Sequence, residues 1–269
     1  MQNITKNNLP LLTFEKFNNF ENELANFVST RHGGVSTGKY ESLNLAWYVG
    51  DDADNVVKNK EALCDAMEIN FHDLHIPRQV HETKIVFLDE KFKDLSWPEQ
   101  ASYLEGIDAI ITNQPHLSIA VATADCVSII LYCPQKKIIA AVHAGWRGTA
   151  KRILSKTLDQ MIDSFGCNPK EIIAGIAPCI SAQAYNVGEE VIAAFRESDH
   201  DIESLFSEKE DGKMHLDLKK ANLVQLLSQG LSEDNIEISN ICTYGDENFF
   251  SARRLGNKSG RFLTGLMMR

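Results

Sequence analysis

The sequence lacks both a long hydrophobic run and an excess of positive charge. No apolar segment approaches the roughly 20 residues that cross a bilayer, and the start from Met1 to Pro10 lacks the basic-then-apolar order of a signal peptide. The 269 residues include 27 Lys and Arg against 37 Asp and Glu, a formal net charge of −10. Because binding to nucleic acid depends on clustered Lys and Arg, we expect a cytoplasmic protein with neither a nucleic-acid nor a membrane partner.

Paired cysteines and domain linkers are also missing. The six cysteines contain no C-x-x-C pair, which fits neither a disulfide scaffold nor a structural zinc finger. We expect reduced thiols that are mostly small core residues. No repeat, low-complexity tract or Gly/Ser-rich linker divides the chain, so residues 1–269 are predicted to form a single domain.

Hydrophobic periodicity predicts strands in runs with helices between them. The expected strands are Phe27–Thr30, Ile85–Leu88, Asp108–Thr112, Leu117–Ala124, Val127–Tyr132, Ile138–His143, Glu171–Ile176, Ile236–Cys242 and Arg261–Met267. The expected helices are Asp54–Met67, Thr149–Phe165, Val187–Ser198 and Leu218–Ser228. This order favours an α+β fold, a layered αββα-like sandwich of mixed sheets flanked by helices, over strict βαβ alternation.

Polar residues follow two of the apolar strands at the points where they end. Asp125 and Cys126 follow one strand, and His143 ends another, just before Gly145-Trp146-Arg147-Gly148. Side chains at strand ends often converge on a pocket. Cys126 can equally be a packed core thiol, and His143 a histidine hydrogen-bonded to the backbone. Arg147 and the start of the helix expected at Thr149 could attract an anion.

Several short motifs occur together and in order along nearly the whole chain. They are Ser29-Thr30-Arg31-His32-Gly33-Gly34-Val35-Ser36, Ser42-Leu43-Asn44-Leu45, Gln79-Val80-His81, Thr123-Ala124-Asp125-Cys126, His143-Ala144-Gly145-Trp146-Arg147-Gly148 and Cys242-Thr243. This set resembles the laccase-domain family, also called multicopper polyphenol oxidase-like or peptidoglycan editing factor proteins and described as purine nucleoside phosphorylases.

The resemblance implies that His81, Cys126 and His143 bind one zinc ion and take part in catalysis. It also implies phosphorolysis of adenosine, inosine and methylthioadenosine, with adenosine deamination as a further activity. Two imidazoles and a thiolate leave one tetrahedral position open, as in catalytic zinc sites. Copper is the alternative metal for such a ligand set.

Further residues are candidates for the chemistry around this metal. Deamination requires a group that moves protons, and Asp125 is the nearest carboxylate in sequence, although a strand-end Asp also often bonds its own backbone. Phosphorolysis requires donors that hold phosphate, for which Arg31 and Arg147 are candidates. Asn44 could bind a base or ribose edge, or serve as a turn residue.

Two other groups of residues are weaker candidates. Arg253 and Arg254 are a further anion site or a solvated pair. His72 and His75 have metal-ligand spacing, but their segment is predicted to be an exposed turn and the family places no metal there.

Three departures from the family pattern leave the substrate preference open. They are Glu82 in place of a usual Gly, Ala177-Pro178-Cys179 in place of Gly-Pro-Ala, and Asn186 in place of a usual Glu.

Three other functions compete with phosphorolysis. One is a cysteine hydrolase that edits peptidoglycan precursors, with Cys126 as nucleophile and His143 as base. The second is a polyphenol oxidase, which the absence of any His-x-His pair disfavours. The third is a binding protein that keeps the metal without turnover. The oligomeric state cannot be derived from the sequence.

Overall fold

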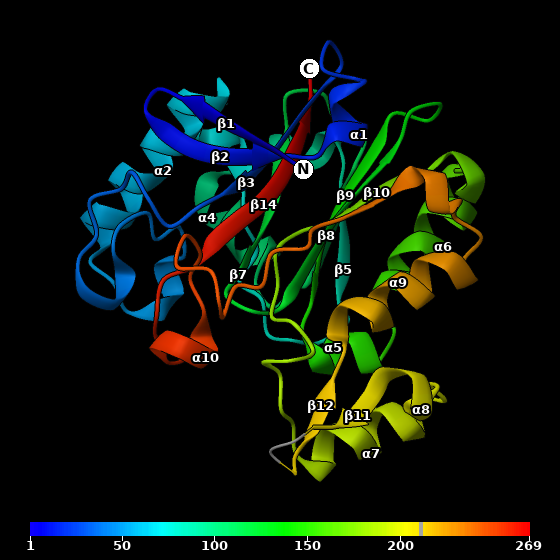
Figure 1. The fold of residues 1–269 in the computed structure, drawn as a ribbon. Helices are drawn as coiled ribbons and strands as arrows, with labels where there is room; N and C mark the ends of the chain where they lie inside the picture. Colours follow the sequence, from blue (N-terminus) through cyan, green and yellow to red (C-terminus); the bar gives the residue numbers. More distant parts are fainter. Residues whose placement is uncertain (210–211) are drawn as a thin grey trace.

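The computed structural model describes residues 1–209 and 212–269, and in these residues two mixed sheets pack face to face (Figure 1). In order across the first sheet, the strands are β1 (Gln2–Lys6), β2 (Leu9–Thr13), β3 (Leu24–Ser29), β14 (Phe262–Met268), β7 (Ser118–Thr123) and β4 (Leu74–His75). The second sheet contains β13 (Ile236–Ile238), β10 (Ile173–Ile176), β8 (Val127–Cys133), β9 (Ile138–Ala144), β6 (Ala109–Thr112) and β5 (Ile85–Leu88). Most neighbours are antiparallel, whereas β4–β7, β5–β6 and β10–β13 are parallel.

Helices cover the outer faces of both sheets. Figure 1 places α2 on one side of the sandwich and α6 and α9 on the other. The helices are α1 (Glu15–Asn18), α2 (Ala53–Met67), α3 (Glu90–Lys93), α4 (Trp97–Tyr103), α5 (Trp146–Ala150), α6 (Ile153–Phe165), α7 (Glu189–Glu197), α8 (Ile202–Leu205), α9 (Leu218–Ser228) and α10 (Ala252–Leu255). A small hairpin, β11 (Phe206–Glu208) and β12 (Met214–Leu216), lies near α7 and α8. The predicted α+β sandwich of mixed sheets is confirmed.

Alternating side chains of the strands divide the core into layers. Between the sheets, Val121 and Leu266 of the first pack with Ile130 and Ala141 of the second. The opposite face of the first sheet packs on α2, where Leu63 is fully buried. Each such buried aliphatic side chain stabilises the fold by roughly 1.5–3 kcal/mol. The sandwich is therefore a rigid frame for the loops at its ends.

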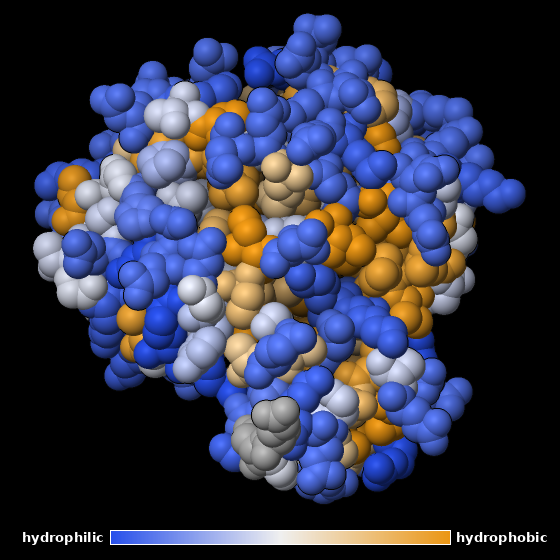
Figure 2. All heavy atoms as spheres, in the orientation of Figure 1, coloured by the Kyte–Doolittle hydropathy of each residue, from blue (hydrophilic) through white to orange (hydrophobic). Residues whose placement is uncertain are grey.

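The surface of the molecule is mostly polar in the orientation of Figure 2. Hydrophilic side chains cover most of this face, and hydrophobic ones are visible in a band across its middle. Among the described residues, no helix has the length and apolar character needed to cross a membrane.

The helix predicted over Thr149–Phe165 is wrong at its start. Helix α5 already begins at Trp146 and ends at Ala150, and α6 begins at Ile153 after Arg152 adopts a left-handed φ of 61°. The Arg152 guanidinium donates to the carbonyls of Ser198 and Asp199, at 3.0 and 2.9 Å. These contacts to a segment distant in sequence stabilise the break between α5 and α6. The local pattern of apolar residues does not predict such a break.

Most other expected elements lie within two or three residues of their observed bounds. The predicted strand over Ile236–Cys242 is the exception, because β13 ends at Ile238. Strands β1, β2, β4, β11 and β12 were not predicted. Several of these are short or lie at a sheet edge, where hydrophobic alternation is brief.

Candidate metal centre

Three ligand side chains from distant parts of the chain meet at one end of the sandwich. His81 lies on the connection from β4 to β5 and Cys126 on the connection from β7 to β8, both of which cross from the first sheet to the second. His143 lies near the end of β9. The ligand atoms of these three residues are all within 4.8 Å of one another. The predicted convergence of His81, Cys126 and His143 is therefore present in the structure.

The loop that carries His81 is fixed by side-chain hydrogen bonds. The amide of Gln79 pairs with the backbone of Ala122 in β7, donating through Nε2 at 2.9 Å and accepting through Oε1 at 2.8 Å. Two residues later, His81 has a left-handed φ of 64°. Non-glycine residues rarely adopt this conformation, and such strain is common at functional sites.

A buried carboxylate, Asp108, joins the His81 loop to His143. Its oxygens accept the backbone N–H groups of Val80, His81 and Glu82 at 3.3, 3.0 and 2.9 Å. One of them also lies 2.8 Å from Nδ1 of His143. Burial raises the pKa of Asp108, but the hydrogen bond and charge of His143 and the backbone donors outweigh burial and lower it. Nε2 of His143 is thereby left for a metal.

The turn that carries Cys126 is held by Asp125, which has a φ of 94°. The carboxylate of Asp125 accepts from Thr243 Oγ1 at 2.6 Å, Ser251 Oγ at 3.0 Å and the Arg253 backbone amide at 2.7 Å. Both oxygens are therefore occupied by donors from α10 and from the segment that precedes it. These contacts give Asp125 a structural role and no support for the predicted role in proton transfer.

The three side chains perturb one another electrostatically. Burial raises the pKa of the Cys126 thiol, but its interactions with His143 and His81 outweigh burial and lower the pKa to about 6. Burial lowers the pKa of His143, yet Asp108 and Cys126 raise it to about 9. A thiolate between imidazoles suits either a metal site or a nucleophilic cysteine with a histidine partner.

The backbone of Gly145 passes close to the side chains of His81 and Cys126. A Cβ at this position would lie 2.9 Å from Cδ2 of His81 and 3.1 Å from Sγ of Cys126, so only glycine fits. Within the described residues, the cluster consists of two histidines and one cysteine. This N/S ligand set suits zinc, and the Asp108 contact is the carboxylate–histidine pairing that usually orients zinc ligands.

Arg147 and Arg253 lie on the exposed side near the cluster. The guanidinium of Arg147 stacks on Trp146 at 4.1 Å, and that of Arg253 on Tyr185 at 5.3 Å. The pKa of Tyr185 is raised first by burial and then by the charge of Cys126, while Arg253 and Arg147 lower it. Both arginines are thus within electrostatic reach of the same phenol as Cys126. From the sequence, Arg253 was a weaker candidate for an anion site than Arg147, but both guanidinium groups act on the same phenol of Tyr185.

The structure assigns structural contacts to two predicted substrate residues. Asn44 is fully buried, and its amide bonds Ala46, Asp51 and the backbone N–H of Arg261. Its amide is therefore already occupied by groups of the protein, which gives the predicted role of Asn44 in substrate binding no support. Arg31 is half-buried; it donates from Nε to the Glu41 carbonyl at 2.6 Å and lies over the Phe250 ring at 5.0 Å.

Arg254 and His75 also differ from what the sequence suggested. Arg254 is half-buried and donates to the carbonyls of Thr243, Tyr244, Asp246 and Phe249, so it is neither solvated nor an anion site. His72 and His75 belong to no cluster of metal ligands in the described part of the chain. His75 is buried in β4, not in an exposed turn.

The three departures from the family pattern have identifiable contacts. Glu82 pairs with Lys151 at 2.5 Å, and Asn186 accepts from the Arg253 guanidinium. Cys179 is a fully buried free thiol, and its backbone pairs with that of Cys242 in an isolated parallel β-bridge. Asn186 therefore lies beside an arginine near the candidate site.

Sequence reasoning missed Asp108 and Gln79 as site residues. Asp108 lies between Ile107 and Ala109, all three fully buried. An acid next to the start of an apolar strand was a usable signal, since buried carboxylates are rare unless they are paired.

The chain is similar to known proteins over nearly its whole length. The family model described as "Multi-copper polyphenol oxidoreductase laccase" matches residues 25–269. The chain is 40% identical over 270 residues to a protein of Bacteroides thetaiotaomicron named "Purine nucleoside phosphorylase", covering 100% of this chain and 99% of that one. It is also 38% identical over 242 residues to "Adenosine deaminase RL5" of an unknown prokaryotic organism, covering 89% and 92% of the two chains.

A solved structure has the same fold. The crystal structure of YlmD from Geobacillus stearothermophilus matches with a TM-score of 0.89 and 29% identity, covering 100% of this chain and 98% of that chain.

Proposed function

Because the chain belongs to the multi-copper polyphenol oxidoreductase laccase family, we propose that it is a zinc-dependent purine nucleoside phosphorylase of the cytoplasm. Its substrates are adenosine, inosine and methylthioadenosine, together with phosphate. Residues 1–269 act as one domain. The single observation that carries the proposal is the cluster of His81, Cys126 and His143, in a chain similar over its whole length to a purine nucleoside phosphorylase.

His81, Cys126 and His143 hold the metal. A zinc ion held by these residues would supply Lewis-acid chemistry at the site. The soft thiolate and two imidazoles also suit copper, which competes with zinc for such sites. Asp108 keeps Nδ1 of His143 occupied and the His81 loop in place, so the ligands are oriented before any metal arrives.

The basic side chains near the cluster hold the phosphate. In phosphorolysis, a phosphate oxygen forms a bond to C1′ of the ribose while the bond from C1′ to purine N9 breaks, and its electron pair leaves with the purine. Arg147 is exposed and its guanidinium presents a planar fork of donors. We assign phosphate binding to Arg147 and Arg253, with Arg31 as a further contributor. Asp125 acts by positioning the turn before Cys126.

Incubation of the purified protein with inosine and phosphate tests this function. We expect hypoxanthine and ribose 1-phosphate in equal amounts and no hypoxanthine without phosphate. His81→Ala and Cys126→Ala should each lose both bound metal and activity. A variant that loses zinc but keeps full turnover would contradict the role of the metal, and a protein that binds zinc without turnover would be a binding protein.

Adenosine deamination is the second candidate reaction at the same site, favoured by the 38% identity to RL5. Adenosine distinguishes the two reactions, because phosphorolysis yields adenine whereas deamination yields inosine. Product analysis with and without phosphate measures each reaction separately.

The cysteine hydrolase alternative rests on the lowered pKa of Cys126. A thiolate bound to zinc is not a free nucleophile. We expect Cys126 in the zinc-loaded protein to react slowly with iodoacetamide, and to react faster after chelation. Rapid alkylation of the loaded protein would instead favour the hydrolase.

A further inference from the structure

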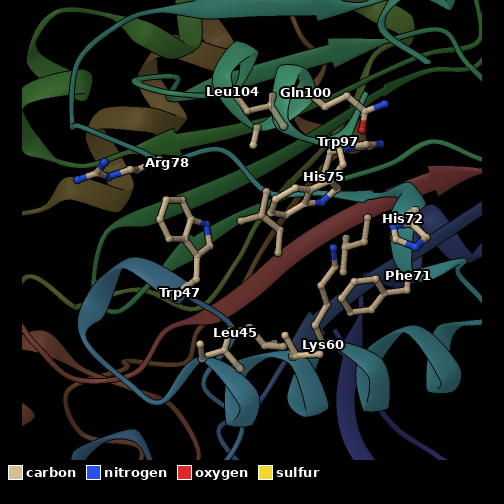
Figure 3. Close-up of a pocket in the computed structure, with 16 residues that line it drawn as sticks. Leu45, Trp47, Lys60, Phe71, His72, His75, Arg78, Trp97, Gln100 and Leu104 are labelled. Carbon is tan, nitrogen blue, oxygen red and sulfur yellow. The ribbon is translucent and has the colours of Figure 1, made fainter. Parts of the chain in front are cut away.

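One cavity of the protein is lined by none of the residues of the His–Cys–His cluster. It measures about 350 Å³ and is lined by α2, the segment around β4, and α4, with Trp47, Phe71 and Trp97 among its walls (Figure 3). None of His81, Cys126 and His143 lines this cavity. Its size is at the lower end of pockets that hold small molecules.

The charged groups of this cavity are all basic. Among the lining residues are Lys60 and Arg78, and no Asp or Glu, although the chain carries a net charge of −10. Figure 3 shows Lys60 beside Phe71, and its ammonium lies 4.3 Å from the ring centroid. No carboxylate of the described residues forms an ion pair with Lys60, whereas Arg78 pairs with Glu105 at 2.6 Å. Lys60 is thus a half-buried cation that lacks a counter-charge.

His75 presents an unpartnered polar group to the same cavity. Its side chain is 7% exposed and packs edge-on against Phe92, with ring centroids 4.9 Å apart. Across residues 1–209 and 212–269, neither ring nitrogen of His75 has a hydrogen-bond partner. Burial, followed by the charge of Lys60, lowers the pKa of His75 to about 4, so the ring is neutral at physiological pH. A neutral imidazole offers one donor and one acceptor, and buried polar groups usually have a partner.

Large aromatic surfaces remain uncovered at this cavity. Trp47 is 56% exposed and Trp97 is 66% exposed. Exposed apolar walls of this kind mark binding sites. Aromatic rings stack well on one another, and a lone cation among them adds attraction for negative charge.

We propose that this cavity binds a planar aromatic anion of one or two rings, whose ring system packs on the tryptophans and whose negative group pairs with Lys60. His75 completes the site with a hydrogen bond to the ligand. This is a second binding site, separate from the proposed chemistry at the metal.

Calorimetric titration with 2-naphthoate and its neutral isostere 2-naphthamide tests the proposal. We expect the carboxylate to bind more tightly. Lys60→Met keeps the length of the side chain and removes its charge, and should weaken naphthoate binding about tenfold because a charge-assisted contact is lost. The same variant should leave naphthamide binding and phosphorolysis unchanged. Lys58→Met, an exposed position of the same helix outside the cavity, is the matched control and should bind as wild type.

His75→Phe keeps the ring that packs on Phe92 and should weaken both ligands by removing the hydrogen bond. Equal affinities of naphthoate and naphthamide for the wild type, or naphthoate binding that Lys60→Met does not change, would overturn the proposal. A second copy of this chain is the rival occupant. A dimer that Trp47→Ser and Trp97→Ser dissociate, with no naphthoate bound by the wild type, would also overturn it.

Discussion

The carboxylate of Asp108 lies 2.8 Å from Nδ1 of His143 in a fully buried environment. The same carboxylate accepts the backbone N–H of His81. One acid therefore orients both histidines of the cluster, so that the site is prepared by the fold itself.

Replacement of Asp108 by Asn should weaken the metal site. The change removes the negative charge beside Nδ1 of His143 and replaces one carboxylate oxygen, an acceptor, with an NH₂ group, a donor. We therefore expect the affinity for zinc to fall by about 10- to 100-fold. Competition with a chelator measures this affinity. Asp89→Asn, at the start of the short helix α3, is a control that should not alter it. Unchanged affinity in Asp108→Asn would show that orientation by Asp108 is unimportant.

Gly145→Ala should obstruct the cluster directly. The new Cβ would lie 2.9 Å from the His81 ring and 3.1 Å from Cys126 Sγ, and one of these must move. We expect lower zinc content and lower kcat. Gly245→Ala is the matched control, since its nearest heavy atom would be 4.0 Å away. If Gly145→Ala binds zinc as the wild type does, the close approach has no consequence.

Arg147→Ala should raise the KM for phosphate more than the KM for inosine. Loss of one charge-assisted contact corresponds to about 1.5–3 kcal/mol, or a tenfold or larger increase in KM. Arg196→Ala, on the exposed side of α7, is the control. A phosphate KM equal to that of the wild type would remove Arg147 from phosphate binding.

Asn44→Ala should reduce stability without a specific effect on substrate binding. The substitution leaves the buried donors and acceptors around Asn44 without partners, at a cost of roughly 1–3 kcal/mol for each unsatisfied group. Chemical denaturation should show the loss, while the KM values of the folded enzyme stay constant. A stable variant with a raised inosine KM would restore Asn44 as a substrate residue.

His75 should make stability depend on pH in the acidic range. Its ordinary pKa of 6.5 is lowered to about 4 in the folded state, so between these values the unfolded chain binds a proton that the folded protein does not. The free energy of unfolding should therefore be unaffected above pH 6.5 and decrease as the pH falls toward 4, by up to about 1.4 kcal/mol per pH unit. Urea unfolding of wild type and His75→Phe across this range isolates the effect. If the free energies of unfolding of the wild type and His75→Phe change with pH in parallel, His75 is not the cause of the pH dependence.

Several features of the fold could be predicted from local pattern. Strand β5 and helix α9 lie at their predicted bounds for local reasons. Strand β5 is a short apolar run, and α9 begins after its cap Asp217 and ends just before Gly230. The break at Arg152 could not be predicted, since it depends on carbonyls nearly fifty residues away.

For the site, the sequence by itself determined which ligands are available and which family they belong to. His81 and His143 offer imidazole nitrogens and Cys126 offers a thiolate sulfur, whatever their positions in the fold. The tertiary structure alone decided that these groups meet, that Asp108 supports two of them, and that Asn44 and Asp125 are occupied elsewhere. The reason is physical: a residue type fixes its own donors and acceptors, whereas their partners come from non-local packing that brings separate strand ends together.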